Sequence, residues 1–507
     1  MAQLTEKPFP PGSYPLVVVG SGPGALQLTY SLRRCGIEHA VISADPAPGG
    51  MFRRWPIFQR MLSWTKPFAD KEKATHAYER FDWNSLLSDD ERLRAIMPSV
   101  MDGTSYFPSR PEMERGLVTF AERANLQVRY GCRWESTRKE GDDFVLSTSD
   151  GEYRAPIVVF AVGVAEPWRP NILQVDGVQQ YGELRPAESY ADRRIFIVGK
   201  QNSGFEIATG LLPFARQIIL ASPSPTKLSV DTRSLVGVRA RYVQPYEDWA
   251  LAGGVVILDA SIESVDKTGN TYQVHTKSPK DSSSLPFEVD DVIAATGFVA
   301  PLRDLPQLGV STFGASRLPA LTPYWESATM PGLYFAGTLM QASGGLKKHG
   351  IPSNSGAVQG YRYNARVLAN HLATTKFGKQ PARTSVHADD VVRLLLDDAS
   401  HGPEVWHQRS YLARVVSIGG DDGIVDAGIE PLAHFVDDDG PDAVAITLEN
   451  NGKDDPYPAV YVRTKHGVKE YLLAPHPLLN FTGPEYEREL TARLEPVLGA
   501  SLTSSTP

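Results

Sequence analysis

The fold is decided by the stretch Leu16-Val17-Val18-Val19-Gly20-Ser21-Gly22-Pro23-Gly24-Ala25, an apolar run that ends in a glycine turn. A helical pattern follows at once over residues 26–34, so the stretch predicts a strand, a tight turn and a helix. In such a unit the first glycine makes the turn, the second lets the backbone approach a pyrophosphate, and a small third residue lets helix and strand pack closely. We therefore predict a bound dinucleotide, held by Gly20, Gly22, Pro23, Gly24 and Ala25.

The bulk composition is that of an ordinary globular protein large enough for several domains. The chain has 507 residues, of which 42% are hydrophobic and 22% charged, and these values are typical of soluble proteins. A formal net charge of −8 without a basic block argues against nucleic acid or an acidic membrane surface as a partner. We therefore expect a small-molecule substrate. The composition does not decide between a monomer and a homo-oligomer.

Cys35 and Cys132 are the only cysteines. This excludes a disulfide framework, a C-x-x-C redox pair and a cysteine zinc site, and the scattered histidines lack metal-ligand spacing, so no metal site is predicted. The first fourteen residues are polar and Pro-rich, and no apolar run reaches the roughly 18 residues of a membrane span. We expect a cytoplasmic protein with a short N-terminal arm.

The region after the first helix supplies further candidates for the first nucleotide site. A second strand is expected over residues 39–43, and the acidic residue that usually follows it and holds the ribose is replaced by Ser43, so we assign the ribose contact to Asp45. Residues 46–70 have no helical or strand period and are dense in Gly, Arg, Trp and Pro. They predict an irregular loop that covers a flat ring such as isoalloxazine, or alternatively caps the core. The loop residues assigned to the cofactor are Gly50, Met51, Phe52 and Trp55.

The strand–turn–helix–strand pattern then occurs a second time, over residues 194–221. Its glycine turn is Gly199-Lys200-Gln201-Asn202-Ser203-Gly204, and the repetition implies a second nucleotide site. Gln201 stands where a second glycine is usual and would crowd a pyrophosphate. The predicted contacts of this site are Gly199, Asn202, Ser203 and Gly204. Lys227 and Arg233 are available for a 2′-phosphate, which favours NADPH slightly over NADH.

The rest of the chain completes an α/β architecture with two Rossmann-like dinucleotide-binding domains and a small appended α+β domain. A strand near residues 292–295 runs into Thr296 and Gly297, and another near 332–336 ends at Gly337 and Thr338; the family resemblance described below implies that these four residues contact a cofactor. A helix follows over 355–371, and beyond about residue 380 short strands alternate with Asp- and Gly-rich turns. The predicted boundaries are an arm at 1–14, a first cofactor domain at 15–166 and 291–378, an inserted second domain at 167–290, and an accessory domain at 379–507.

Four places in residues 16–372 together resemble flavoproteins with two dinucleotide-binding domains, in particular the flavin-containing and N-hydroxylating (class B) monooxygenases. Gly20–Ala25 resembles the FAD cradle, Gly49–Pro56 the Gly-Gly-x-aromatic loop against the flavin, Gly199–Gly204 the NADPH turn, and Ala295-Thr296-Gly297-Phe298 the link between domains. The resemblance implies FAD and NADPH as cofactors, with the NADPH domain inserted into the FAD domain. It also implies O2 as co-substrate and transfer of oxygen, through a flavin hydroperoxide, to an amine nitrogen or a sulfur.

The chain departs from the family pattern where the chemistry would occur. Leu62-Ser63-Trp64-Thr65-Lys66-Pro67 stands in place of the family's Leu-x-x-Asn-x-Pro, whose Asn contacts the flavin hydroperoxide. On this likeness Thr65 and Trp64 are the candidate donors, and Lys66 would offset negative charge on the reduced flavin. No histidine lies between the two domains at residues 175–181, which disfavours Baeyer–Villiger chemistry. A flavin-dependent reductase that passes electrons to another acceptor and a non-catalytic flavoprotein remain as alternatives.

Overall fold

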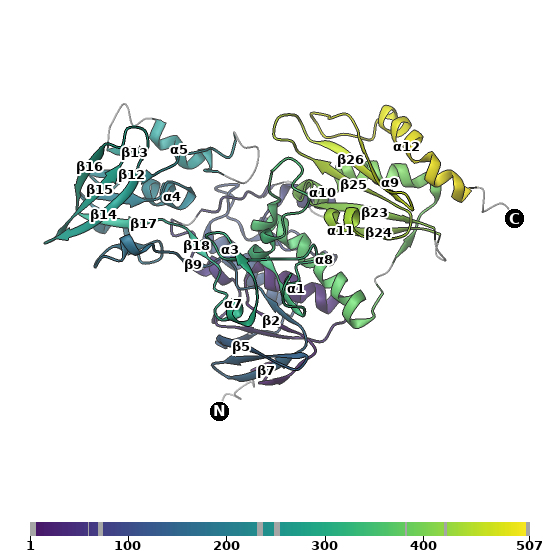
Figure 1. Cartoon of the computed structure of the whole chain (residues 1–507), viewed down its shortest axis with the longest axis horizontal. Coiled ribbons are helices and arrows are strands. Elements are labelled where there is room, and N and C mark those ends of the chain that lie inside the picture. Colours follow the sequence, from purple (N-terminus) through teal and green to yellow (C-terminus); the bar gives the residue numbers. More distant parts are fainter. Residues whose placement is uncertain are drawn as a thin grey trace.

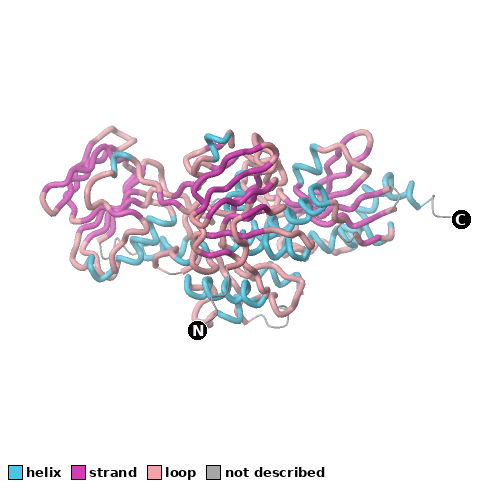
Figure 2. Tube along the Cα trace, turned by 90° about the horizontal axis from the view of Figure 1, so that it is seen from below, coloured by secondary structure: helices cyan, strands magenta, loops and turns pink. Residues whose placement is uncertain are grey.

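The computed structural model describes residues 7–58, 60–68, 75–230, 237–247, 254–380, 383–419 and 423–502. Figure 1 shows three lobes in a row; strand β2 (Val17–Val19) and helices α1 (Pro23–Arg34) and α8 (Val358–Phe377) belong to the lobe between the other two. The tube view in Figure 2 shows the same row from below, with the C-terminus at one end.

The central lobe is built on a five-stranded parallel sheet in the order β21-β8-β2-β3-β4. Its strands are β2 (Val17–Val19), β3 (Ala40–Ser43), β4 (Arg129–Tyr130), β8 (Val158–Phe160) and β21 (Leu333–Phe335). All three residues of β2 are buried, because α1 and α8 cover one face of the sheet, at Val18, and an antiparallel sheet covers the other face, at Val17 and Val19. α1 (Pro23–Arg34) packs against α8 (Val358–Phe377). α1 begins at Pro23, slightly before the predicted start, because proline suits the first turn of a helix.

Smaller elements surround this sheet. A second sheet orders β1 (Gly12–Ser13), β7 (Gly151–Ala155), β6 (Asp143–Thr148) and β5 (Trp134–Glu140), so part of the predicted arm is paired with the domain. The helices are α2 (Ile96–Val100), α3 (Arg110–Arg123) and α7 (Leu305–Leu308), and the 3-10 turns are η1 (Gly50–Arg53), η3 (His76–Phe81), η6 (Gly337–Ala342) and η7 (Asn354–Gly356). A short hairpin pairs β19 (Thr312–Phe313) with β20 (Leu318–Pro319).

The second lobe is another five-stranded parallel sheet, in the order β10-β17-β11-β12-β13. Its elements are β10 (Gln179–Gln180), β11 (Arg194–Val198), β12 (Gln217–Ser222), β13 (Val255–Asp259), β17 (Asp291–Ala294), α4 (Asn202–Leu211), α5 (Ala240–Glu247), η4 (Asn171–Leu173) and η5 (Ala187–Tyr190). Beside it β14 (Ser261–Thr268), β15 (Thr271–Lys277) and β16 (Ser284–Val289) form an antiparallel sheet. This lobe contains the predicted repeat.

The predicted boundary after residue 290 is wrong. Strand β17 pairs with β10 and β11, for example Val292 with Phe196, so residues 291–294 belong to the second lobe. The chain returns to the central lobe through β18 (Phe298–Val299), which pairs with β9 (Glu166–Pro167), the segment on which it leaves. The two crossing segments therefore lie side by side between the lobes (Figure 1).

The third lobe is a six-stranded antiparallel sheet in the order β22-β24-β23-β25-β26-β27. Its elements are β22 (Thr384–Ser385), β23 (Leu412–Ile418), β24 (Ile424–Pro431), β25 (Ala443–Glu449), β26 (Tyr457–Thr464), β27 (Gly467–Leu472), α9 (Ala388–His401), α10 (Pro403–His407), α11 (Leu432–Asp437) and α12 (Pro484–Leu502). Helices α9 and α12 pack together, and α9 also contacts β23 and β25. Neither β24 nor α9 was predicted from the sequence.

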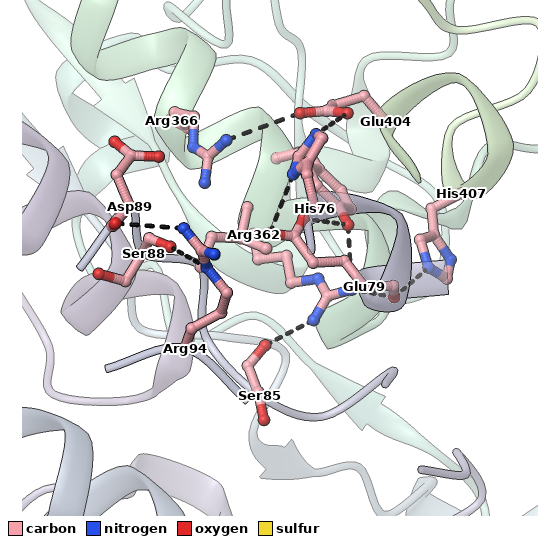
Figure 3. Close-up of polar contacts among 12 residues, drawn as sticks. His76, Glu79, Ser85, Ser88, Asp89, Arg94, Arg362, Arg366, Glu404 and His407 are labelled. Carbon is pink, nitrogen blue, oxygen red and sulfur yellow. Dashed lines mark hydrogen bonds and ion pairs between the residues drawn. The ribbon is translucent and has the colours of Figure 1, made fainter. Parts of the chain in front are cut away.

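A buried charged cluster joins the third lobe to the central lobe (Figure 3). His76 of η3 lies 2.9 Å from Glu404 of α10 and 3.1 Å from Glu79, and Arg366 of α8 lies 3.6 Å from Glu404. The fully buried Arg362 donates to the carbonyls of Ser85 (2.6 Å) and Glu79 (2.9 Å). Since each buried charge has a partner of opposite sign or several hydrogen bonds, the cluster offsets the cost of its burial.

The described residues contain neither a candidate membrane span nor a candidate metal site. No helix in that part of the chain is long and apolar enough to cross a membrane. Within the same ranges, no group of three or more His, Cys, Asp or Glu side chains is arranged to hold a metal ion.

Candidate functional site

The first glycine turn opens onto a cavity of about 450 Å³ at the carboxyl ends of β2 and β3. In an open parallel sheet this is the edge at which ligands bind. We call it the first cradle. The predicted residues that line it are Gly20, Gly22, Pro23, Gly24, Asp45, Gly50, Met51, Phe52, Gly337 and Thr338. Ala25 is buried behind them, which agrees with the packing role assigned to the third small residue.

Three glycines of the first cradle are required by close backbone contacts, and a fourth is not. A Cβ on Gly20 would lie 2.5 Å from the carbonyl oxygen of Ala161, one on Gly24 would lie 2.3 Å from Cα of Gly337, and one on Gly50 would lie 2.7 Å from Cα of Gly22. A Cβ on Gly22 would meet only Cα of Gly50, at 3.8 Å, in ordinary contact. The protein itself therefore leaves room at Gly22, and the missing side chain keeps that space open for a ligand.

The end of β3 is organised by a serine that the sequence analysis did not select. The Ser21 hydroxyl lies 2.8 Å from the Ser43 hydroxyl and 3.1 Å from a carboxylate oxygen of Asp45, and the Asp45 amide donates to Ser43 at 3.1 Å. Ser43 thus helps to hold Asp45 at the wall of the first cradle, so a carboxylate is present at the end of β3 although residue 43 itself is a serine. The ribose contact of Asp45 stays a prediction.

A second cavity, of about 520 Å³, lies between the central and second lobes; we call it the interdomain cavity. Four residues line both this cavity and the first cradle: Met51, Phe52, Thr338 and Tyr361. The lining residues from the second lobe include Asn202, Ser203, Glu206, Arg239 and Tyr242. Met61, Leu62, Phe298 and Val358 contribute to a largely apolar surface, a composition typical of small-molecule sites.

Three buried polar atoms in the wall of this cavity have no hydrogen-bond partner among the described residues. They are Nε1 of Trp55, Nε of Arg239 and Oε1 of Gln359. Buried polar groups are normally satisfied, so two isolated donors and an isolated acceptor in one cavity indicate contacts that a ligand would complete. Trp55 was predicted from its loop, whereas Gln359 follows the first residue of α8 and carried no sequence signal.

The second glycine turn has the backbone geometry of the first. A Cβ on Gly199 would lie 2.3 Å from the carbonyl oxygen of Ala295, and one on Gly204 would lie 2.2 Å from that of Gly199. Asn202 and Ser203, in the first turn of α4, line the interdomain cavity. Gln201 is exposed and precedes the helix with extended backbone, and the buried Lys200 turns away to pair with Asp259 and the carbonyl of Leu258.

The three predicted catalytic residues, Trp64, Thr65 and Lys66, lie in the described part of the chain but line neither of the two cavities. Thr65 is fully buried; its hydroxyl donates to Asp82 at 2.9 Å and accepts from the amide of Asn84 at 3.0 Å. The Trp64 ring packs on Trp83, with the ring centroids 5.4 Å apart, and Lys66 lies over the Phe81 ring at 3.8 Å. Asn84 also binds the Ser63 hydroxyl, which reaches the interdomain cavity. Thr65 is placed to position Ser63 through Asn84.

Other candidates fall outside the cavity walls. Thr296 donates to the carbonyl of Trp168, and Gly297 accepts from the Trp168 amide at 2.9 Å, so both fix the crossing between lobes. Lys227 is in the described chain and its carbonyl accepts from Val238. Arg233 lies outside the described residues.

Glu206 joins the two lobes inside the interdomain cavity. Its carboxylate accepts hydrogen bonds from the backbone amide of Phe58 (2.9 Å) and from the hydroxyl of Tyr181. Burial raises the pKa of Glu206, and the hydrogen bonds from Tyr181 and Phe58 oppose the rise. The carboxylate thus connects α4 to the loop that carries Trp55.

The chain thus contains two strand–turn–helix units of the dinucleotide-binding type, one at Gly20 and one at Gly199. The family model described as "Pyridine nucleotide-disulphide oxidoreductase" matches residues 17–337, and the chain therefore belongs to this family, one of FAD-dependent oxidoreductases. The matched residues include both glycine turns, Gly20–Ala25 and Gly199–Gly204.

The chain is also similar to individual proteins. It is 27% identical over 432 residues to FAD-dependent oxidoreductase domain-containing protein 2 of the mouse, a match that covers 79% of this chain and 64% of the mouse protein. Among solved structures it resembles the bacillithiol disulfide reductase of Staphylococcus aureus, with a TM-score of 0.56, 14% identity and coverage of 72% and 99%. It likewise resembles the ornithine N-hydroxylase of Kutzneria, with a TM-score of 0.54, 17% identity and coverage of 72% and 100%. These likenesses confirm the predicted class B monooxygenase-like fold.

Proposed function

We propose that the chain is an FAD-dependent monooxygenase that consumes NADPH and O2 and oxygenates an amine nitrogen or a sulfur atom of a small molecule. The observation that carries the proposal is the interdomain cavity, which is largely apolar, touches both cradles and holds an unpartnered donor and acceptor. NADH is the alternative nucleotide. The site needs no protein nucleophile, which agrees with the absence of a cysteine from its described wall.

The residues of the first cradle fit FAD. Gly22 leaves open the space that a pyrophosphate needs, and the N-terminus of α1 has no side-chain cap, so its first amides are free for an anion. Asp45 is placed for the ribose, and Met51, Phe52, Thr338 and Tyr361 form the boundary at which the flavin ring would meet the interdomain cavity. When bound, FAD supplies hydride acceptance and oxygen activation.

The chain's own residues would bind, orient and exclude water. The N-terminus of α4, with Asn202 and Ser203, would hold the nicotinamide nucleotide. Apolar side chains such as Leu62, Phe298 and Val358 would keep water from the reacting atoms. The Trp55 N–H and the Gln359 carbonyl would fix the orientation of the substrate.

A reductase that passes electrons to another acceptor is the second candidate. The observation that favours it is the placement of Thr65, because the residue aligned with the family's oxygen-stabilising Asn is bound to Asp82 and Asn84 instead. A dithiol pathway through the protein is excluded by the two separate cysteines.

Flavin reduction followed by oxygen transfer distinguishes the candidates. The FAD-loaded chain is reduced anaerobically with NADPH or NADH, and is then mixed with ¹⁸O2 and a thioether. A monooxygenase gives ¹⁸O-labelled sulfoxide, whereas a reductase is bleached by the nucleotide but yields only hydrogen peroxide. If neither nucleotide bleaches the flavin, both enzymatic proposals are wrong and a non-catalytic flavoprotein is the remaining interpretation.

A conservative variant tests the role of the cavity wall. Trp55→Phe removes the N–H and keeps an aromatic ring, and we expect the fraction of NADPH that yields product to fall several-fold while flavin reduction is retained. Trp168→Phe is the matched control, because Trp168 is 42% exposed and lies outside this cavity. An equal effect of both variants would remove Trp55 from the proposed site.

A further inference from the structure

A third cavity, of about 200 Å³, lies where the three lobes meet; we call it the side chamber. The second lobe contributes Arg239, the central lobe contributes Pro352 and Ser353, and the third lobe contributes Trp406 and Arg409. Arg239, Pro352 and Ser353 also line the interdomain cavity. The side chamber therefore adjoins the proposed reaction site, and part of its wall comes from the C-terminal domain.

The charge of the side chamber is positive. No Asp or Glu occurs among the described residues that line it, whereas Arg239 and Arg409 both do. In the described part of the chain no carboxylate lies within 4.0 Å of either guanidinium, and Nε of Arg239 is buried without a partner. His407 is held by the carbonyl of Glu79 at 3.0 Å (Figure 3), and burial keeps its pKa well below the usual value, so its ring is neutral.

Within the described ranges, the contacts that hold the two arginines do not neutralise their charge. Cζ of Arg409 lies 3.7 Å from the centroid of the Trp406 ring, and its Nε donates to the Trp406 carbonyl at 3.1 Å. Arg80 approaches the same ring at 4.5 Å, which increases the local positive charge. The backbone amide of Arg239 donates to the side chain of Asn202, in the first turn of α4, at 3.0 Å.

A positioned cation without a counter-charge is costly to bury, and an anionic ligand offsets that cost. We propose that the side chamber binds a carboxylate of the small-molecule substrate, whose nitrogen or sulfur lies in the adjoining interdomain cavity. This inference rests on the proposed function, because it takes the interdomain cavity as the reaction site. It gives the C-terminal domain a role in selecting the substrate.

The 2′-phosphate of NADPH is the other anion that could occupy the side chamber. In a dinucleotide-binding unit this phosphate is read just after the second strand. The second strand here is β12, which ends at Ser222, and Ser222 is a described residue that does not line the side chamber. The participation of Arg409 and Trp406, from a domain outside the nucleotide-binding unit, favours the substrate.

The test compares a charged ligand with its neutral counterpart on the full FAD-loaded chain. The probes are 4-(methylthio)benzoate and thioanisole, which differ by one carboxylate, and calorimetry measures their dissociation constants. We expect the carboxylate to bind at least tenfold more tightly, and Arg409→Gln or Arg239→Gln to remove most of that preference. Arg409→Lys should retain part of it.

The matched control is Arg493→Gln. Arg493 also lies over an aromatic ring of the C-terminal domain, 5.3 Å from the centroid of Tyr471, but it is exposed and outside the side chamber. This variant should keep the full preference for the carboxylate. Should Arg409→Gln fail to fold, Arg239→Gln provides the same test from another lobe.

Two results would overturn the inference. One is equal affinity of the wild-type chain for the two probes. The other is a loss of affinity for NADPH but not for NADH in Arg409→Gln, which would assign the chamber to the 2′-phosphate. Oxygen transfer is measured separately from binding. If the chain prefers the carboxylate but transfers no oxygen, the anion site is supported and the monooxygenase proposal is wrong. If it transfers oxygen without preferring the carboxylate, the monooxygenase proposal is supported and the anion site is wrong.

Discussion

Gly22 and Gly24 are two residues apart in the same turn, yet they are glycines for different reasons. A Cβ on Gly24 would lie 2.3 Å from Cα of Gly337, whereas a Cβ on Gly22 would meet no protein atom closer than 3.8 Å, at the wall of the open first cradle. Gly24 is thus required by the fold, since α1 and η6 approach at that point. Gly22 is required only by what the cradle holds.

This difference gives a paired prediction. Gly22→Ala should leave the melting temperature of the FAD-free chain within a few degrees of wild type but weaken FAD binding at least tenfold, because the methyl group occupies the space of the pyrophosphate. Gly24→Ala should destabilise the chain itself by about 2–3 kcal/mol, as overpacked sites do. Thermal melts and flavin absorbance of the purified variants check both. Full flavin content in Gly22→Ala would contradict the assignment of the first cradle.

Residues whose role is set by the backbone could be predicted from the sequence, and residues whose role is set by side-chain orientation could not. The spacing of Gly20, Gly22 and Gly24 is a local pattern with one geometric solution. The direction of the Thr65 hydroxyl depends on Asp82 and Asn84, in a different segment of the chain. The unpartnered oxygen of Gln359 is likewise visible only after the fold has assembled its surroundings.

At the scale of elements, η3 and α10 are held together by a histidine between two carboxylates. Burial disfavours the charged ring of His76, but Glu404 and Glu79 outweigh burial and raise its pKa to about 10. The pKa of an unfolded histidine is about 6.5. Because the folded pKa is the higher one, this contact stabilises the fold fully below pH 6.5 and is lost as the pH rises toward 10.

The pH dependence of stability follows from that shift. Between pH 6.5 and 9.5 we expect the free energy of unfolding to fall by about 1 kcal/mol through His76, a modest value because its side chain is half exposed. His76→Gln should remove this component of the pH dependence, and His466→Gln, at an exposed site, should not. Urea titrations at both pH values measure the difference. An identical slope in wild type and His76→Gln would show that the cluster contributes no such dependence.

The elements themselves were predictable where a hydrophobic period was strong. The Val- and Ile-rich strands of both parallel sheets were recognised as short apolar runs, since both faces of such strands are buried. The two-residue edge strands β4 and β10 were not recognised as members of these sheets. The sheet to which β17 belongs could not be predicted, because Val292 and Ile293 would fit either parallel sheet equally well. Only their pairing with β11 assigns them to the second lobe. α5 was missed for a different reason: it follows a segment without a clear period.

At the scale of the whole molecule, the proposed reaction site is formed by the central and second lobes together, and neither lobe contains it alone. The family resemblance implied an inserted second domain, which suits the order of the motifs. The β9–β18 pair shows that the chain leaves and re-enters the central lobe on paired segments. The contact between the third lobe and the side chamber could not be predicted. Trp406 and Arg409 lie in a segment that resembles no binding motif, and they become informative only beside Arg239.

The carboxylate of Glu206 is the point at which relative placement of the first two lobes can be tested. It accepts hydrogen bonds from Phe58 of the central lobe and from Tyr181. Glu206→Ala leaves the buried Phe58 contact unmade, which costs about 1–3 kcal/mol. Since the two cradles must face each other for hydride transfer, we expect flavin reduction by NADPH to slow about tenfold while FAD content is unchanged.

Anaerobic stopped-flow measurements of flavin bleaching test this expectation. Glu183→Ala is the control, because Glu183 is an exposed carboxylate of the second lobe whose partners, Gln180 and Arg169, lie near it in the sequence. It should reduce at the wild-type rate. If Glu206→Ala also does so, the lobes are held in register by other contacts, of which the β9–β18 pair is the first to examine; if Glu206→Ala loses its FAD, then the carboxylate supports the first cradle rather than the approach of the nucleotide.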